Sequence, residues 1–251
     1  MKKLLLSLLI ATVTLGIAVA EESDAAKHNS TQMNATSAEA QIKHDDGLRV
    51  VFIGNSITLH GVAPKIGWHH AWGMAASAAE KDFVHLVTKG IEEKTGRKCD
   101  VRVRNLANFE RKFREYDLKN IQDLADFRPD YLIIALGENV PHLKEEAEQL
   151  EYREAFARLL KCFLPEQQKP RTVVRGVFWP SKWKDKMMSQ VASDYGLVFV
   201  KADISTDPAM MALGLFEHKG VQHHPGDAGM AEIAKRILAG FFPEQADKEK
   251  N

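Results

Sequence analysis

Short runs rich in valine and isoleucine alternate along this chain with longer stretches of helical periodicity, and this alternation limits its possible folds most. Such runs have few polar interruptions, as strands buried on both faces do. The expected strands are Arg49–Ile53, Asp100–Arg104, Tyr131–Leu136, Thr172–Phe178 and Leu197–Val200. The expected helices are about Glu80–Lys94, Arg114–Asp126, Glu145–Phe163, Lys184–Tyr195 and Ala228–Gly240. The alternation predicts an α/β protein with a parallel five-stranded sheet between two helical layers, an α/β/α sandwich.

The two ends of the chain differ in composition from the part between them. Two lysines, an apolar run and the small residues Ala18-Val19-Ala20 predict a signal peptide over residues 1–20, and therefore export to the periplasm or the medium. Residues 21–46 are polar and predict a flexible leader. Residues 47–243 are expected to form one domain, and residues 244–251 a polar tail. The apolar run of the signal is too short to span a bilayer comfortably, so no membrane span is expected once the signal is removed.

Charge and cysteine content limit the kinds of partner and cofactor that the sequence predicts. The chain has 34 Lys and Arg residues against 34 Asp and Glu residues, interspersed, which argues against a nucleic-acid or anionic-membrane surface. No Cys or His spacing typical of a metal site occurs, so neither a metal nor another cofactor is predicted. Cys99 and Cys162, the two cysteines, can be free thiols or a disulfide. The sequence does not indicate the oligomeric state.

Polar residues follow the expected strands, where ligands bind in parallel α/β sheets. Ser56 lies one Gly-Asn step after the first strand, and a serine becomes a nucleophile when a base takes its proton. His224, ahead of the last helix, is the candidate base, with His223 as its competitor. Asn139, after the third strand, can donate to an oxyanion beside the Ser56 N–H. Taken alone, Ser56 and Asn139 are more often turn or cap residues, and the histidines can belong to an ordinary helix-entry loop, so the combination carries the hypothesis.

Four motifs in order resemble those of the SGNH (GDSL-like) hydrolase superfamily. They are Gly54-Asn55-Ser56-Ile57-Thr58, Asn105-Leu106-Ala107-Asn108-Phe109-Glu110, Gly137-Glu138-Asn139 and His224-Pro225. The resemblance spans Leu48 to about Phe242. It implies a flavodoxin-like α/β/α sandwich and cofactor-free ester hydrolysis through an acyl-enzyme on Ser56. It also implies an oxyanion hole made by the Ser56 N–H, the Glu110 N–H and the Asn139 amide.

Two positions near the expected oxyanion hole depart from the family pattern. Asn55 stands where the GDSL motif has aspartate, which we expect to be a minor change. Glu110 stands where the second motif has glycine, so a carboxylate is added at the rim. Such a charge opposes an oxyanion unless it points away or pairs with Arg111.

The third departure concerns the histidine. The family's aspartate lies three residues before the histidine, and Val221 occupies that position here. Another group must then fix the tautomer of His224. Glu217, seven residues upstream, is slightly favoured as this partner over a backbone carbonyl, which would leave a Ser-His dyad.

The tryptophans bear on the substrate. Trp68, Trp72, Trp179 and Trp183 fall in two short segments after the first and fourth strands. Indole rings at the rim either stack on a sugar or staple loops to the core, and the sequence favours neither reading. If they bind, Trp68, Trp72 and Trp179 predict an acylated carbohydrate as substrate.

Arg175 lies inside an apolar strand, where a guanidinium needs a partner. An internal ion pair with Glu138 or Glu110 is favoured over a clamp for a substrate carboxylate, because buried charges are usually paired within the protein.

Together these features predict an exported serine esterase that hydrolyses acetyl esters, with a small-molecule or polysaccharide ester as its partner. The alternative is a catalytically silent carbohydrate-binding protein on the same fold, which Val221 and Glu110 favour. An acyltransferase is a third possibility, since it would differ only in its preferred acceptor.

Overall fold

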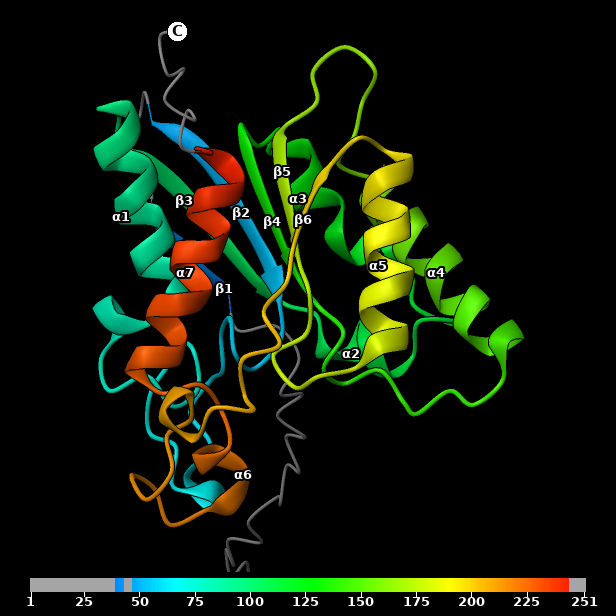
Figure 1. Cartoon of the computed structure of the whole chain (residues 1–251). Coiled ribbons are helices and arrows are strands. Elements are labelled where there is room, and N and C mark those ends of the chain that lie inside the picture. Colours follow the sequence, from blue (N-terminus) through cyan, green and yellow to red (C-terminus); the bar gives the residue numbers. More distant parts are fainter. Residues whose placement is uncertain (1–38, 43–46, 244–251) are drawn as a thin grey trace, which may run out of the picture. The chain divides into compact units, whose positions relative to one another are not determined.

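The computed structural model describes residues 39–42 and 47–243, and in this part of the chain six strands form one sheet (Figure 1). The strands are β1 (Glu39–Ile42), β2 (Leu48–Gly54), β3 (Cys99–Asn105), β4 (Tyr131–Ala135), β5 (Arg171–Arg175) and β6 (Val198–Val200). Their order is β1-β3-β2-β4-β5-β6. Strands β2 to β6 are parallel, so the predicted five-stranded parallel sheet is confirmed.

Strand β1 corrects the predicted flexible leader. It pairs antiparallel with β3, with Glu39 opposite Arg104 and Ile42 opposite Val101. Four residues of the segment 21–46 therefore form the edge of the sheet. The predicted signal peptide, the rest of the leader and the polar tail lie outside the described residues.

The strand order places the functional edge of the sheet. Counted from β2, the parallel strands run second, first, third, fourth, fifth, which is the flavodoxin order. The order reverses at β2, whose neighbours are β3 and β4. Ligands bind beyond the carboxyl ends of the strands at such a reversal, because the connecting loops diverge there.

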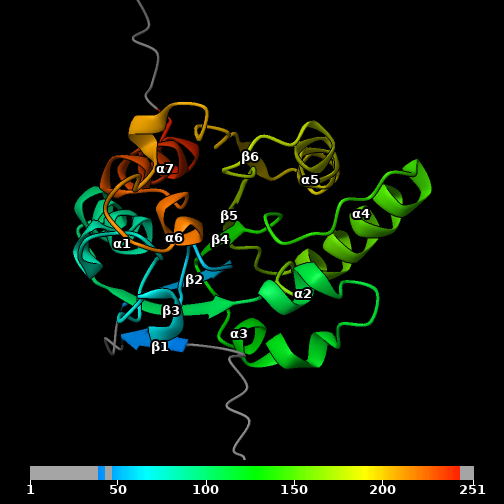
Figure 2. The ribbon, with the colours of Figure 1, turned by 90° about the horizontal axis from the view of Figure 1, so that it is seen from below.

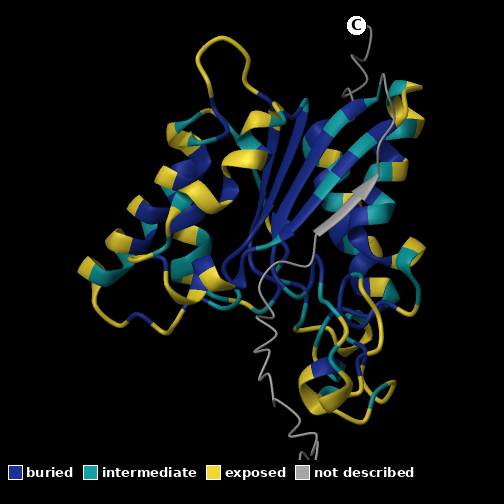
Figure 3. Cartoon of the chain, turned by 180° about the vertical axis from the view of Figure 1, so that it is seen from behind, coloured by how far each residue is buried: buried dark blue, intermediate teal, exposed yellow. Residues whose placement is uncertain are grey.

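Helices cover both faces of the sheet. Helices α1 (Phe83–Thr95) and α7 (Asp227–Phe241) pack on one face with Val50 and Phe52, whereas α4 (Glu146–Lys161) and α5 (Lys182–Asp194) pack on the other with Val51 and Ile53. Successive residues of β2 thus serve opposite layers, as strand geometry requires. Strands β2, β4 and β5 are almost entirely buried between the layers, β3 is partly buried, β6 is half-exposed, and the outer helix faces are exposed; the burial of β1 is not described (Figure 3).

Three short helices were not predicted as such. They are α2 (Ala107–Arg111), α3 (Gln122–Asp126) and α6 (Lys219–Gln222). The expected helix 114–126 is instead a 3-10 turn followed by α3. Seen from below, α6 lies on the side of α7 and α2 on the side of α4 (Figure 2).

The strand expected over Thr172–Phe178 is β5, which ends earlier than predicted, at Arg175. The N–H groups of Val177 and Phe178 donate to the carboxylates of Asp185 and Glu138, so they leave the strand ladder.

Cys99 is buried in β3, Cys162 follows α4, and both are free thiols. None of the helices in the described ranges is long and apolar enough to cross a membrane.

Candidate active site

Ser56 lies on a tight turn directly after β2. The Asn55 carbonyl accepts hydrogen bonds from the N–H groups of Thr58 and Leu59 at 3.0 and 2.9 Å, which closes the turn. A Cβ on Gly54 would lie 1.8 Å from Thr58 Oγ1, so only glycine fits ahead of this turn. The Ser56 N–H has no acceptor among the described residues and is available to a ligand.

His224 lies between α6 and α7, and its Nε2 is 2.9 Å from Ser56 Oγ. Its Nδ1 is 2.7 Å from the Gly220 carbonyl oxygen. A carbonyl oxygen only accepts, so Nδ1 carries the proton and Nε2 presents a lone pair to the serine. Burial lowers the pKa of His224 to about 4, although the Gly220 carbonyl opposes this shift. The imidazole is therefore neutral and able to take a proton near pH 7.

The expectation for Glu217 is corrected by this geometry. Glu217 is exposed, and the Gly220 carbonyl occupies the Nδ1 position for which Glu217 was proposed. The partner lies four residues before His224, about one helical turn back along the chain. His223, the competing base, instead has its Nδ1 against the Lys219 carbonyl.

An apolar cluster supports the histidine loop. Val221, at the family's aspartate position, is buried with Trp68, Met74 and Ala212. The ring of Trp179 meets the ring of His224 edge-on, with centroids 5.3 Å apart. Packing and one backbone carbonyl thus hold the imidazole.

Glu110 does not have the expected backbone role. Its N–H donates to the Leu106 carbonyl within α2, so it is not free for an oxyanion. Its side chain is fully buried and accepts hydrogen bonds from Asn55 Nδ2 at 3.0 Å, Gly137 N at 2.5 Å and Asn139 Nδ2 at 2.6 Å. The carboxylate thus points into the protein.

Burial and the neighbouring Glu138 carboxylate raise the pKa of Glu110 to about 7. The three N–H donors act in the opposite direction, because they stabilise the ionised form.

Arg175 forms the internal ion pair that the sequence favours. Its side chain is 0% exposed, and Nη2 lies 2.8 Å from Glu138 Oε1. Burial raises the pKa of Glu138, but the Arg175 guanidinium and the N–H donors of Phe178 and Asn55 outweigh it, so the net pKa is lowered. Because Arg175 is enclosed, the alternative role as a clamp for a substrate carboxylate is corrected.

A pocket of about 410 Å³ opens at this edge of the sheet. Its lining residues are Ser56, His60, Ile66, Met74, Asn105, Ala107, Asn108, Arg111, Asn139, His218, Gly220, Val221 and His224. Ser56, Asn139 and His224, predicted from separate motifs, thus meet around one cavity. The sequence did not single out His60 and His218. Their only signal is proximity to Ser56 and His224, which is weak without the fold.

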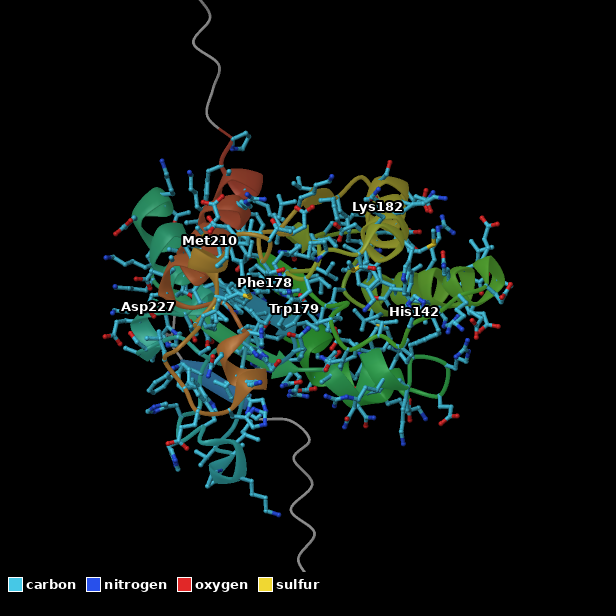
Figure 4. The ribbon with its side chains drawn as sticks, turned by 60° about the horizontal axis from the view of Figure 1, so that its bottom comes forward. His142, Phe178, Trp179, Lys182, Met210 and Asp227 are labelled. Carbon is cyan, nitrogen blue, oxygen red and sulfur yellow. The ribbon has the colours of Figure 1, made fainter. Side chains whose placement is uncertain are left out.

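The tryptophans do not line this pocket. Trp68 is 0% exposed and donates from Nε1 to the His60 carbonyl, so it staples the loop after β2 to the core. Trp72 is half-buried, stacks on His70 and donates to the Ala76 carbonyl. Trp179 lies near the centre of the face that comes forward in Figure 4, against His224. The predicted carbohydrate-stacking role of Trp68 and Trp72 is therefore corrected, and Trp179 contacts the base.

Within the ranges that the structure describes, no three His, Cys, Asp or Glu side chains are grouped so that they could hold a metal ion.

No protein-family model matches this chain, and no curated protein sequence matches it. Solved structures of Axe2 from Geobacillus stearothermophilus do match. One variant, described as an acetyl-xylooligosaccharide esterase, has a TM-score of 0.51 at 17% identity over 80% of this chain and 97% of that chain. A second variant has a TM-score of 0.50 at 18% identity over 78% and 94% of the two chains. A third, described as an acetylxylan esterase, has a TM-score of 0.50 at 18% identity over 80% and 97%.

At these identities the likeness shows a shared fold. The α/β/α sandwich that the SGNH resemblance predicts is thereby confirmed.

Proposed function

We propose that this chain is a serine esterase of the SGNH type, with Ser56 as nucleophile and His224 as base. The observation that carries the proposal is the 2.9 Å contact between Ser56 Oγ and His224 Nε2, in a pocket at the reversal of strand order. A neutral imidazole with its Nδ1 proton held by a carbonyl is in the protonation state that this role requires.

The proposed reaction has two steps. Ser56 Oγ attacks the ester carbonyl carbon while His224 Nε2 takes the hydroxyl proton, and His224 then returns that proton to the departing alcohol. Water, deprotonated by His224, then attacks the acyl-serine; the bond to Ser56 Oγ breaks, His224 returns the proton to that oxygen, and the carboxylic acid is released. The Ser56 N–H and the Asn139 amide are the proposed oxyanion donors, a role worth on the order of 10²–10³ in rate per donor.

The proposed substrate is an acetyl ester on a carbohydrate. The amide of Asn108 and the rings of His60 and His218 supply hydrogen-bonding groups for hydroxyls, beside apolar Met74. The fold shared with an acetyl-xylooligosaccharide esterase supports this choice. We also propose export of the chain, on the basis of residues 1–20.

A fluorophosphonate probe tests the proposal on the mature protein. We expect one adduct, located by peptide mass on Ser56 and absent from the His224→Ala variant. A folded sample that forms no adduct would contradict an activated serine. Acetate release from a panel of acetylated glycans tests the substrate, and cleavage of long-chain lipid esters without acetate release would contradict it.

A catalytically silent carbohydrate-binding protein remains the second candidate, because no carboxylate contacts His224 Nδ1 in the described part of the chain. The two functions separate in the Ser56→Ala variant. If the chain is a binding protein, this variant keeps the glycan affinity of the parent, and the parent itself shows no turnover.

A further inference from the structure

The side-chain amide of Asn139 is held from two sides. Arg111 Nη2 donates to its Oδ1 at 3.0 Å, and its Nδ2 donates to Glu110 Oε2 at 2.6 Å. A guanidinium can only donate, so Oδ1 must face Arg111 and Nδ2 must face Glu110, which leaves one orientation of the amide. The second N–H of Nδ2 has no partner among the described residues and is available to a ligand in the pocket that Asn139 lines.

Glu110 is itself immobilised. Its other oxygen, Oε1, accepts from Gly137 N and Asn55 Nδ2, and Asn55 Nδ2 also donates to Glu138 Oε2 at 2.5 Å. An aspartate at position 55 could not donate and would add a third carboxylate to this buried group. The amide at position 55 and the carboxylate at position 110 therefore belong together, although each departs from the family pattern separately.

We propose that Glu110 is a positioning residue, which fixes the Asn139 amide so that one of its N–H groups stays directed to the oxyanion. The glycine of the family motif is thus replaced by a side chain that acts behind the oxyanion donor. This inference rests on the proposed esterase function, and Glu110 acts only through Asn139.

A double-mutant cycle tests whether Glu110 acts through Asn139. Glu110→Gln keeps the shape of the side chain but replaces one carboxylate oxygen by an amide NH₂ group. Because both oxygens accept from N–H groups, that NH₂ group faces a donor where an acceptor is needed. For p-nitrophenyl acetate we expect Glu110→Gln to lower kcat by about 10²-fold and to change KM by less than about twofold. Asn139→Ala is expected to lower kcat by about 10²–10³-fold, and adding Glu110→Gln to it should cost no more than about a further twofold.

Additive free-energy losses, which would leave kcat of the double variant about 10⁴-fold or more below the parent, would overturn the proposal. Full activity of Glu110→Gln would overturn it as well. The matched control is Glu151→Gln, the same change at an exposed ion pair on α4, which should keep the parental kcat. If Glu110→Gln does not fold, Glu110→Asp replaces it in the cycle, because a side chain one methylene shorter keeps the carboxylate but withdraws it from Asn139 Nδ2. The same non-additive and additive outcomes then support or overturn the proposal.

A second readout does not depend on esterase activity. The side-chain amide signals of Asn139 in a ¹⁵N-labelled sample are identified by their loss in Asn139→Ala. They should shift in Glu110→Gln and stay in place in Glu151→Gln. If the parent protein hydrolyses no ester, the proposed function fails while these signals still decide the positioning role. Unshifted signals in Glu110→Gln would contradict it.

Discussion

The two sides of the pocket are held by different means. The oxyanion side, the turn Gly137–Val140 after β4, is bound by buried charged groups: Glu110 accepts from Gly137 N and Asn139, and Arg175 pairs with Glu138. The base side, residues 216–224 around α6, is held by apolar packing and by hydrogen bonds of neutral groups, among them the Gly220 carbonyl at His224 Nδ1 and the Gln222 amide at Gly214 N, and its residues Glu217 to Gly220 are exposed.

This difference shows that a site can lack an acid beside its histidine and still be rich in carboxylates. Here the carboxylates lie behind the oxyanion donor. Buried charges tolerate little change, since removing one partner leaves the other uncompensated. A backbone carbonyl, in contrast, is present whatever side chain stands at its position. The oxyanion side should therefore be sensitive to substitution and the base side tolerant of it, except at His224.

The largest effect is expected on the base side, from a substitution of His224, with Glu217 as its comparison. His224→Ala removes the proton acceptor and should lower kcat/KM by on the order of 10⁴–10⁶-fold. Glu217→Gln should leave kcat/KM within about twofold of the parent, because a carbonyl already binds Nδ1. Steady-state hydrolysis of p-nitrophenyl acetate measures both. Similar losses in the two variants would show that Glu217 belongs to a triad after all.

An intermediate effect is expected on the oxyanion side from Lys184. Its ammonium donates to the carbonyls of Gly137, Glu138 and Val140 at 2.8, 3.3 and 3.0 Å. Lys184→Met keeps the apolar stem but frees these carbonyls, so the turn loosens and kcat should fall about tenfold. Lys182→Met, an exposed lysine on the same helix, is the control (Figure 4). Equal kcat in both variants would show that the turn does not depend on the ammonium.

The smallest effect is a titration that should leave His224 nearly unchanged. With a pKa of about 4, about nine-tenths of His224 rings remain neutral at pH 5. The pKa of His85 is raised from 6.5 by its hydrogen bond to Asp82, so that ring is protonated at the same pH. Ring signals of ¹³C-labelled histidine measure both, and a His224 midpoint near 6.5 would show that burial does not keep the base neutral.

The sequence predicted the sheet because buried parallel strands are continuous apolar runs, which need no knowledge of neighbours. It also predicted that Ser56 and Asn139 meet, since residues after parallel strands share one edge, and the family resemblance added His224 ahead of the last helix. The short helices α2 and α6 were missed, because four or five residues show no helical period.

The incorrect prediction of Glu217 as the partner of His224 has a different cause. A backbone carbonyl has no signature in the sequence, so an acidic side chain was the available inference. The destination of the Glu110 carboxylate was equally hidden, since it depends on donors from two separate segments, one after β2 and one after β4.

The pairing of β1 with β3 has a consequence for where this chain can be cut. A protein that began at residue 47 would leave one edge of β3 with bare N–H and C=O groups, and such edges recruit strands from other molecules. The opposite edge, β6, is only three residues long and offers little to pair with. Residues 39–42 thus act as a guard against self-association, and shortened proteins should keep them.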